Sequence, residues 1–311
     1  MSVFDFFTRP VEQRFPSVAA MERVAVKRIP KFASDYMVGG IGREVGRDRN
    51  ITQLDSVRFT PRYVVDYETP PDISSTIFGK WDAPFGPGPV GLTGLMWPRA
   101  QIHIARAAAE HNVPIGLSTY GTETIEDAGA IAGKNLWFQL YPIHDEDIER
   151  DLMKRFEAVG GEVMIVTVDI PQSTRRERDL GNGLAVPPRQ DYITYWQAAT
   201  HPAWAIETLR HGMPKFKTVL RYVPPDTPAQ SSMQILGSLS AGHVGPERLR
   251  RYRDEWKGKL IVKGVLHQDD VKMCLDTGVD GIVVSNHGGR QLDGAITAPE
   301  VLPQIRQYAG G

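Results

Sequence analysis

Short apolar segments alternate with longer amphipathic ones along most of this chain, and this alternation limits the possible folds more than any other feature. The pattern runs from residue 82 onward and is interrupted over residues 171–258. Strands are expected at residues 85–92, 113–117, 136–140, 163–168, 260–262 and 281–284. Helices are expected at residues 99–111, 122–132, 145–159, 248–256 and 268–276. Strands that alternate with helices in this way predict βαβ units and a parallel sheet.

Two common architectures are built from such units, the open doubly wound sheet and the closed (β/α)8 barrel. A doubly wound domain that binds a dinucleotide opens its first unit with Gly-x-Gly-x-x-Gly, and the first unit here has no such segment. The run of β-branched residues at 163–168 is typical of a strand that is buried on both faces. We therefore expect an α/β fold of the (β/α)8 TIM-barrel class.

The barrel is expected to occupy residues 81–311, and residues 171–258 form a long loop insertion within it. A loop of this length inside a compact domain usually has a function or is disordered. Residues 1–80 are expected to form an N-terminal helical lead-in. Within the lead-in, residues 17–37 predict a helix that a proline interrupts, whereas residues 39–80 predict little regular structure.

The composition is that of an ordinary globular protein, and it argues against several classes of partner. The 36 Lys and Arg residues balance 37 Asp and Glu residues, which gives no reason to expect nucleic acid or an anionic membrane as the main partner. Cys274 is the only cysteine, so we expect no internal disulfide and no Cys-based metal site. The sequence contains no run of about 18 apolar residues that could span a bilayer. The expected location is the cytoplasm, and no metal site is expected.

The most informative segment is Ser-Asn-His-Gly-Gly-Arg-Gln-Leu-Asp at residues 285–293, directly after the strand expected at 281–284. In a (β/α)8 barrel the active site lies at the carboxyl ends of the strands. His287 can accept a proton near neutral pH, and Arg290 can bind both oxygens of a carboxylate. A lone His-x-x-Arg would more often be a glycine-rich surface turn. The complete segment instead favours a site for an acid substrate that loses a proton.

This segment resembles the active-site signature of the FMN-dependent α-hydroxy-acid dehydrogenases and oxidases, a family that includes glycolate oxidase, L-lactate dehydrogenase and mandelate dehydrogenase. Residues from about 17 to 308 follow the family's order. The resemblance implies an FMN cofactor and oxidation of a small L-2-hydroxy acid to the 2-oxo acid, with hydride transfer to the flavin. His287 would be the general base that acts on the substrate hydroxyl, and Arg290 would bind the substrate carboxylate. A carbanion route is the competing mechanism.

The same resemblance assigns further residues at the ends of the expected strands. Asp169 would pair with His287 and fix its tautomer, by the logic of other carboxylate–His pairs. Arg176 would be a second arginine for the substrate carboxylate, and Tyr141 would face the substrate. Contacts with the flavin are implied for Pro89, Val90, Gly91, Ser118, Gln139, Thr167, Lys263 and Ser285. Taken alone, residues 89–91 would be read as a turn, Tyr141 as core packing and the charges around Arg176 as a solvated loop.

The chain departs from the family pattern at two places. Ser34 stands where the family is expected to have a tyrosine that contacts the substrate carboxylate, which would leave room for a bulkier substrate, whereas Tyr36 would be a flavin contact. The family also continues with two further βα units that bind the flavin phosphate, so roughly the last two units of the barrel are expected to be absent here. The alternative hypothesis is therefore a non-catalytic remnant, or a partial-barrel interaction protein, that does not retain FMN.

Several properties stay open at this point. The electron acceptor could be oxygen, a quinone or a cytochrome, and the resemblance makes a homotetramer possible. Another phosphate-binding barrel, such as a flavin-dependent isomerase, would need a different set of residues after the strand at 281–284. The identity of the 2-hydroxy acid is not determined by these motifs.

Overall fold

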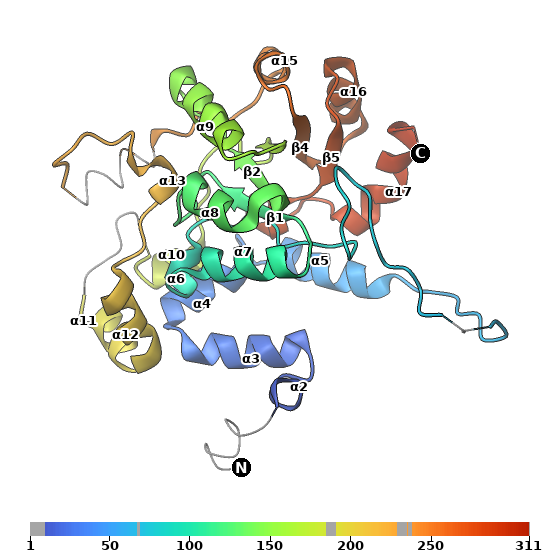
Figure 1. Ribbon diagram of the computed structural model, residues 1–311. Coiled ribbons are helices and arrows are strands. Elements are labelled where there is room, and N and C mark those ends of the chain that lie inside the picture. Colours follow the sequence, from blue (N-terminus) through green and yellow to red (C-terminus); the bar gives the residue numbers. More distant parts are fainter. Residues whose placement is uncertain (1–9, 67–68, 185–190, 229–234, 236–237, 311) are drawn as a thin grey trace.

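A computed structural model describes residues 10–66, 69–184, 191–228, 235 and 238–310 of the chain (Figure 1). Its centre is a parallel sheet of five strands in which spatial order follows chain order. The strands are β1 (Ile115–Ser118), β2 (Leu136–Leu140), β3 (Val163–Thr167), β4 (Lys259–Val265) and β5 (Gly281–Val284). Each strand pairs in parallel with the next one along the chain. This succession of parallel strands and crossover helices is the arrangement of a (β/α)8 barrel, of which the described strands form an open part.

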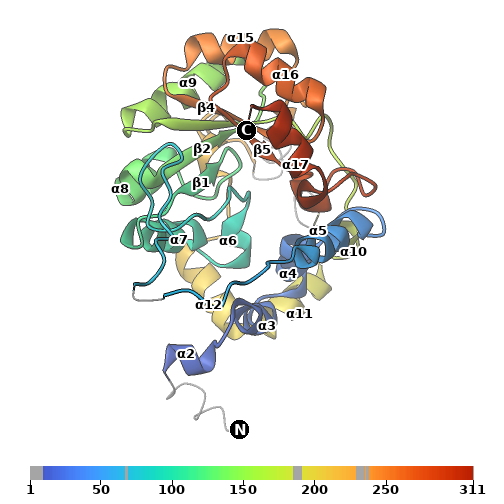
Figure 2. The ribbon, with the colours of Figure 1, turned by 90° about the vertical axis from the view of Figure 1, so that its right-hand side faces the viewer.

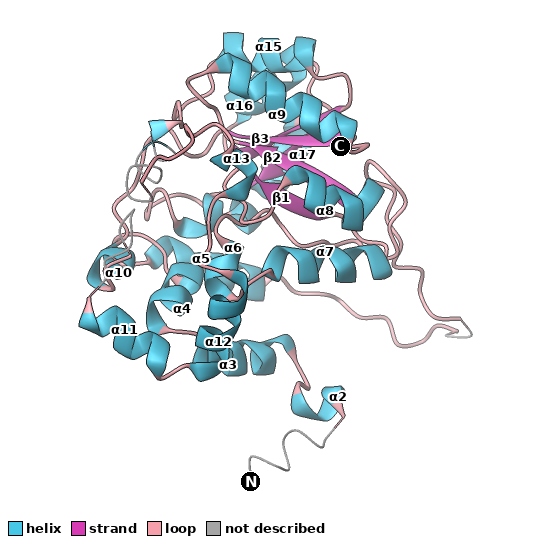
Figure 3. Ribbon diagram, turned by 60° about the vertical axis from the view of Figure 1, so that its left-hand side comes forward, coloured by secondary structure: helices cyan, strands magenta, loops and turns pink. Residues whose placement is uncertain are grey.

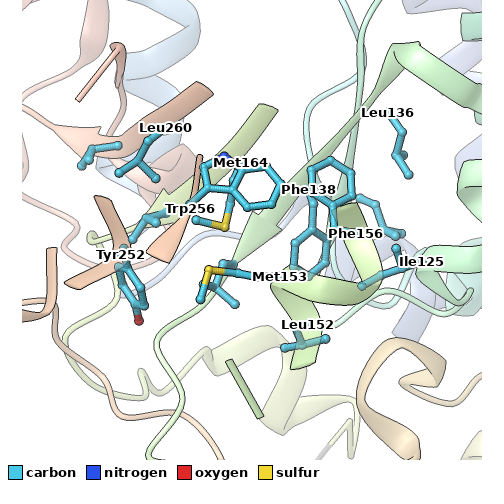
Figure 4. Packing of buried hydrophobic residues seen from close by; sticks show 14 of the residues in the cluster. Ile125, Leu136, Phe138, Leu152, Met153, Phe156, Met164, Tyr252, Trp256 and Leu260 are labelled. Atoms are coloured by element: carbon cyan, nitrogen blue, oxygen red, sulfur yellow. The ribbon is translucent and has the colours of Figure 1, made fainter. Parts of the chain in front are cut away.

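The helices before, between and after the strands pack on the outer face of the sheet (Figure 1). They are α7 (Ala100–Glu110), α8 (Ile125–Ala132), α9 (Glu146–Ala158), α15 (Pro246–Glu255), α16 (Gln268–Thr277) and, after β5, α17 (Ala298–Tyr308). Figure 4 shows the core between sheet and helices, where Phe138 of β2 lies against Phe156 of α9. The Phe156 ring in turn stacks on Trp256, with ring centroids 5.6 Å apart. This burial supplies the main force that holds each helix to the sheet.

The inner face of the sheet carries a smaller apolar cluster centred on Val163, Ile165 and Ile261. Phe78 packs against this cluster from the segment before β1, and its ring centroid lies 6.2 Å from that of Trp137. A Cβ atom at Gly281 would lie 2.9 Å from the Phe78 ring. The Phe78 ring therefore occupies the space on the inner face of the sheet that a side chain at position 281 would need.

The expectation of six strands is wrong, because residues 85–92 do not form a strand. This segment runs beside β1, and the Gly116 N–H donates to the carbonyl of Pro87 (2.9 Å). The segment contains Pro87 and Pro89, which have no N–H to donate to a ladder. The other five expected strands and all five expected helices are present, with ends shifted by a few residues.

The N-terminal region is more regular than the sequence predicted. The helix expected at 17–37 is present as two helices separated by a break at Pro30. Residues 39–80, expected to have little regular structure, contain the additional helix α5. The helices of this region are α2 (Val11–Arg14), α3 (Val18–Arg28), α4 (Lys31–Val38) and α5 (Val45–Ser56). The first turn of α5 is capped from a distance, because the carboxylate of Asp293 accepts a hydrogen bond from the Gly46 N–H (2.9 Å).

The insertion at 171–258 is largely helical where the structure describes it. Before α15 it contains α10 (Glu177–Gly181), α11 (Tyr192–Ala199), α12 (Pro202–His211) and α13 (Lys217–Leu220). Figures 2 and 3 show α10–α12 gathered with α3–α5 below the sheet, on the side away from α15 and α16. Short turns at α6 (Thr93–Met96) and at η2 (His287–Gly289) lie near the same group of helices. In the described ranges, no helix combines the length and apolar character that crossing a bilayer requires.

Candidate active site

The carboxyl ends of four of the five strands border one cavity of about 2530 Å³. Ser118 ends β1, Tyr141 follows β2, Lys263 lies in β4, and Ser285 follows β5. The opposite wall comes from the insertion and from α4. The volume exceeds the roughly 300–1,000 Å³ of a typical small-ligand pocket, so the cavity has room for a cofactor together with a substrate.

His287 and Asp169 form a hydrogen-bonded pair at the edge of this cavity. His287 Nδ1 lies 2.9 Å from Asp169 Oδ1, so an Nδ1–H donates to the carboxylate and Nε2 is left as the proton-accepting atom. Burial lowers the pKa of His287, and the charges of Lys263 and Arg290 lower it further, although Asp169 opposes them. Burial favours the neutral form of Asp169, but His287 and Lys263 outweigh it and lower the pKa of that carboxyl. The pair is therefore a neutral base next to a carboxylate anion at neutral pH.

The backbone of the His287 turn is strained and is held by neighbouring side chains. His287 has φ 57°, a left-handed conformation that is uncommon for a non-glycine residue, and Gly288 and Gly289 continue it at 68° and 70°. The His287 N–H donates to Ser285 Oγ (3.0 Å). The side chain of Asn286 exchanges hydrogen bonds with Asn50 of α5. Helix α5 thus supports the turn that aims the imidazole into the cavity.

Lys263 places a cation beside the same pair. Its Nζ lies 3.2 Å from Asp169 Oδ2 and 3.2 Å from Ser285 Oγ. It also lies 3.3 Å from His287 Nδ1. Since its side chain is only 15% exposed, this cation acts on the cavity at short range with little solvent screening.

Two arginines flank the ring of Tyr36. The guanidinium carbon of Arg290 lies 5.2 Å from the ring centroid, and that of Arg176 lies 5.4 Å from it. Arg290 Nη1 donates to the carbonyls of Tyr36 (2.9 Å) and Gly39 (2.6 Å), which fixes its orientation. Burial lowers the pKa of Arg290, and the like charge of Arg176 lowers it further. Two guanidiniums held close together in a cavity wall form a strong binding site for a carboxylate.

The structure corrects the interpretation of Ser34. Its hydroxyl donates to the carbonyl of Lys31 within α4, and its side chain is not part of the cavity lining. Residues two apart on a helix point roughly 200° away from each other, so Tyr36 faces the cavity while Ser34 faces the core. Tyr36 is the phenol beside the arginines, and its hydroxyl lies 3.4 Å from the Gly91 carbonyl. The inference that Ser34 makes room for a bulkier substrate is therefore wrong.

The residues expected to contact a flavin fall into two groups. Those that line the cavity are Pro89, Val90, Gly91, Ser118, Lys263 and Ser285. Gln139 and Thr167 are instead buried behind the cavity wall, each 1% exposed, and the Gln139 amide donates to the Thr167 hydroxyl. For Gln139 to contact a ligand in the cavity, its amide would have to leave the Thr167 hydroxyl and donate to the ligand instead.

The wall fits the ring of an FMN molecule. Backbone at 89–91, two serine hydroxyls and the Lys263 ammonium present donors and acceptors along one side of the cavity. Gln291 lines the same cavity, and its buried Oε1 has no hydrogen-bond partner among the described residues. An acceptor of this kind is costly to bury unless a ligand or water donates to it.

Three aromatic residues, Tyr120, Tyr141 and Phe216, lie next to one another in the cavity wall. Tyr141, which the sequence predicted to face the substrate, lines the cavity with its ring centroid 5.1 Å from that of Tyr120. Burial raises the pKa of Tyr141, and burial likewise raises that of Tyr120 to about 12 although a hydrogen bond with Ser240 opposes it. Phe216, 5.5 Å from Tyr120, was not predicted because it lies in the insertion, where no periodic pattern relates it to a strand.

Comparisons with known proteins agree with this geometry. Residues 25–311 match the sequence profile of a family described as FMN-dependent dehydrogenase. (S)-mandelate dehydrogenase from Pseudomonas putida is 35% identical over 299 residues, covering 94% of this chain and 74% of that protein. An L-lactate dehydrogenase from Caulobacter vibrioides is 37% identical over 299 residues, covering 94% and 77% respectively.

Solved structures give the same result for the fold. A crystal structure described as the monotopic membrane protein (S)-mandelate dehydrogenase superposes with a TM-score of 0.89 at 34% identity, covering 96% of this chain and 79% of that one. A mandelate oxidase structure superposes with a TM-score of 0.79 at 30% identity, covering 96% of this chain and 76% of that one. The chain thus spans about three-quarters of the length of these relatives.

Proposed function

Because the chain belongs to the FMN-dependent dehydrogenase family, we propose that it oxidises an L-2-hydroxy acid to the 2-oxo acid with His287 as the general base. The observation that carries the proposal is the juxtaposition of two features on one cavity. One is the His287–Asp169 pair (2.9 Å), and the other is the pair of guanidiniums around Tyr36. A base and a carboxylate site in one cavity suit a substrate that bears a carboxylate next to a hydroxyl group.

Each side chain has a defined part in this proposal. Arg290 and Arg176 bind the substrate carboxylate, and the Tyr36 hydroxyl donates to it in place of its long hydrogen bond to the Gly91 carbonyl (3.4 Å). The substrate hydroxyl then faces His287 Nε2, which accepts its proton, and Asp169 stabilises the imidazolium that results. FMN, when bound, supplies the acceptor for the hydride that leaves the α-carbon. The Lys263 ammonium balances negative charge on the cofactor side of the site.

We also propose that the substrate carries an aromatic or other bulky group. The aromatic wall of Tyr120, Tyr141 and Phe216 supports this, because aromatic rings bind apolar groups and prefer edge-to-face neighbours. The similarity to (S)-mandelate dehydrogenase points the same way. A kinetic comparison of glycolate, L-lactate, 2-hydroxyoctanoate and L-mandelate tests it, and glycolate as the best substrate would contradict it.

A visible spectrum of the purified chain, followed by anaerobic addition of a 2-hydroxy acid, tests the function itself. The proposed oxidation bleaches the flavin absorbance and releases one equivalent of 2-oxo acid per flavin. The alternative function, a partial-barrel interaction protein that does not retain FMN, predicts no protein-bound flavin absorbance even after FMN is added and the unbound FMN is removed. The observation that supports this alternative is the edge strand β5, in which every residue is only half-buried.

For the location, we propose the surface of a membrane. Helix α11 contains no charged residue, and its Tyr192 and Trp196 are 81% and 70% exposed. Leu209 of the neighbouring α12 is 85% exposed, and Arg210 follows it. Exposed aromatic and aliphatic residues next to cations are typical of helices that lie in the membrane interface. The relative described as a monotopic membrane protein supports the proposal.

A homotetramer, which the resemblance implied, is testable by light scattering.

A further inference from the structure

Asp179 is an acidic residue in the wall of the cavity, close to both cavity guanidiniums, and the proposed reaction gives it no part. It lies on α10, one turn after Arg176. Its Oδ2 is 3.2 Å from Arg176 Nη1, and its side chain is only 13% exposed. The charge of Arg290 also acts on it. A buried anion beside a site for another anion needs a reason, because it competes with the ligand unless it has a separate task.

The positive charges of the two guanidiniums oppose each other. Both lie within 5.4 Å of the centroid of the Tyr36 ring, and like charges this close in a cavity wall repel each other. Arg290 is fixed by two backbone carbonyls. Arg176 is held differently: in the described part of the chain, Asp179 is the carboxylate within ion-pair distance of it. Asp179 is therefore the carboxylate placed to oppose the repulsion that Arg290 exerts on Arg176.

The other charged groups around α10 are engaged elsewhere. Glu177 accepts a hydrogen bond from the Gly42 N–H (3.0 Å). Arg178 donates to Glu44 (2.5 Å) and lies 3.6 Å from Asp35. These contacts fix α10 to α4 and to the start of α5, so the backbone of α10 stays in place whatever the charge on Asp179. Loss of that charge then affects the Arg176 side chain rather than the whole element.

We propose that Asp179 is a positioning residue that holds Arg176 toward the substrate carboxylate against the repulsion of Arg290. This inference rests on the proposed function, because it assigns Arg176 to the substrate carboxylate. The ionised form of Asp179 is the form that holds Arg176. A neutral residue at this position releases the guanidinium to other rotamers, and the carboxylate of the substrate loses one of its two arginines.

The proposal implies a pH dependence of substrate binding. Burial raises the pKa of Asp179; Arg176 and Arg290 oppose this effect, and Asp35 adds to it. Burial raises the pKa of Tyr141, which also lines this end of the cavity, so Tyr141 stays neutral over the acidic range. As the pH falls through the raised pKa of Asp179, Asp179 becomes neutral and no longer holds Arg176. This ion pair, here called the clamp, is then lost and carboxylate binding weakens. Protonation of His287 acts in the opposite direction, because an added positive charge strengthens the binding of an anion.

The test uses FMN-loaded protein with L-mandelate as substrate and benzoylformate, its 2-oxo acid, as a ligand that does not react. We expect Asp179→Asn to raise both the KM for L-mandelate and the calorimetric Kd for benzoylformate about tenfold. The kcat should stay within about threefold, because the base and the cofactor are untouched. Asp179→Glu, which keeps the charge, should recover part of the affinity. Glu177→Gln, which removes a carboxylate from the same helix, should behave as the wild type.

The outcomes separate this proposal from the function on which it rests. An Asp179→Asn protein with unchanged Kd for benzoylformate, or one that loses kcat and keeps KM, overturns the clamp and leaves the proposed function standing. A wild-type protein that neither binds benzoylformate nor oxidises L-mandelate overturns both. A second measurement follows the Kd of the wild type and of Asp179→Asn from about pH 8 to pH 5. Protonation of His287 strengthens binding in both proteins, so the proposal requires the wild type to lose affinity relative to Asp179→Asn on acidification, and parallel pH profiles of the two proteins overturn it.

Discussion

At the residue scale, the His287 imidazole is the group on which the proposed chemistry depends most. Replacing it with asparagine removes the proton acceptor but keeps a polar side chain of similar reach, so we expect kcat to fall by ~10²–10⁴-fold. Flavin content should stay close to that of the wild type, because the residues expected to contact the ring are unchanged. Activity within a few-fold of wild type, measured by anaerobic flavin reduction, would remove His287 from the role of base.

The pH profile of the wild type tests the same residue without a mutation. Burial and two nearby cations lower the pKa of His287 from its usual range, and the base works only when neutral. The acidic limb of kcat/KM should therefore lie below roughly pH 6.5, the usual range for a histidine, with activity lost as the pH falls through that limb. If the acidic limb of the wild type lies well above this pH and the His287→Asn variant lacks it, the pKa of His287 is not lowered. That result would contradict the charge arrangement around Lys263 and Arg290.

Arg290 provides a second test at this scale. A lysine ammonium cannot reach the carbonyls of Tyr36 and Gly39 and bind both oxygens of a carboxylate at the same time, as the planar guanidinium can. We expect Arg290→Lys to raise KM for the 2-hydroxy acid at least tenfold, with a smaller fall in kcat. Steady-state kinetics with L-mandelate and L-lactate decide it. If both constants are unchanged, Arg290 does not bind the substrate.

At the scale of elements, the strands and helices with a strong hydrophobic period were predictable, and those whose stability comes from distant contacts were not. The first four residues of β3 are apolar and the strand is buried on both faces, so its sequence identifies it without tertiary information. Helix α5 is mostly polar, and Asp293, far along the chain, caps its first turn. Whereas α5 was missed, residues 85–92 were predicted as a strand that is not present. Their apolar content suggested the strand, but Pro87 and Pro89 do not permit it.

The site divides in the same way. The turn at 285–293 follows a recognisable strand, so His287 and Arg290 could be assigned from their order in the chain. The roles of Ser34 and Tyr36 could not be separated without knowing which face of α4 meets the cavity. Asp179 and Phe216 lie in the insertion, where no period of the sequence relates a residue to the sheet. Only their contacts in three dimensions bring them to the site.

The exposed apolar surface of α11 and α12 gives a prediction for an element. Replacing Trp196 with serine removes an aromatic side chain that is 70% exposed and therefore changes little in the core. We expect the variant to lose several-fold in flotation with vesicles of anionic phospholipid, because interfacial binding grows with the apolar area inserted. Phe59→Ser is the matched control, since Phe59 is 90% exposed but belongs to another segment. Equal flotation of Trp196→Ser and wild type would contradict a membrane surface for α11.

At the scale of the whole molecule, the two edges of the sheet differ. Every residue of β1 is buried, and the segment before it runs alongside, where the Pro87 carbonyl accepts a hydrogen bond from the Gly116 N–H. Every residue of β5 is only half-buried, and in the described part of the chain β5 pairs with β4 alone. An edge with free backbone groups next to apolar side chains is a site for further strands or for aggregation. In a barrel of this class, such strands also complete the phosphate end of a cofactor site.

We therefore expect the 311-residue chain to hold FMN weakly and to aggregate more readily than a version to which two further βα units of a related enzyme are joined. The added strands would cover β5, and their loops would supply N–H donors to the phosphate, while the ring contacts at Lys263 and Ser285 stay the same. The joined form should melt at least about 5 °C higher and retain more flavin after gel filtration. Both forms are purified in parallel and compared for melting temperature and flavin-to-protein ratio. If the 311-residue chain already holds one flavin per chain and melts as high as the joined form, the open edge at β5 does not limit this protein, and the cavity residues alone suffice to bind the cofactor.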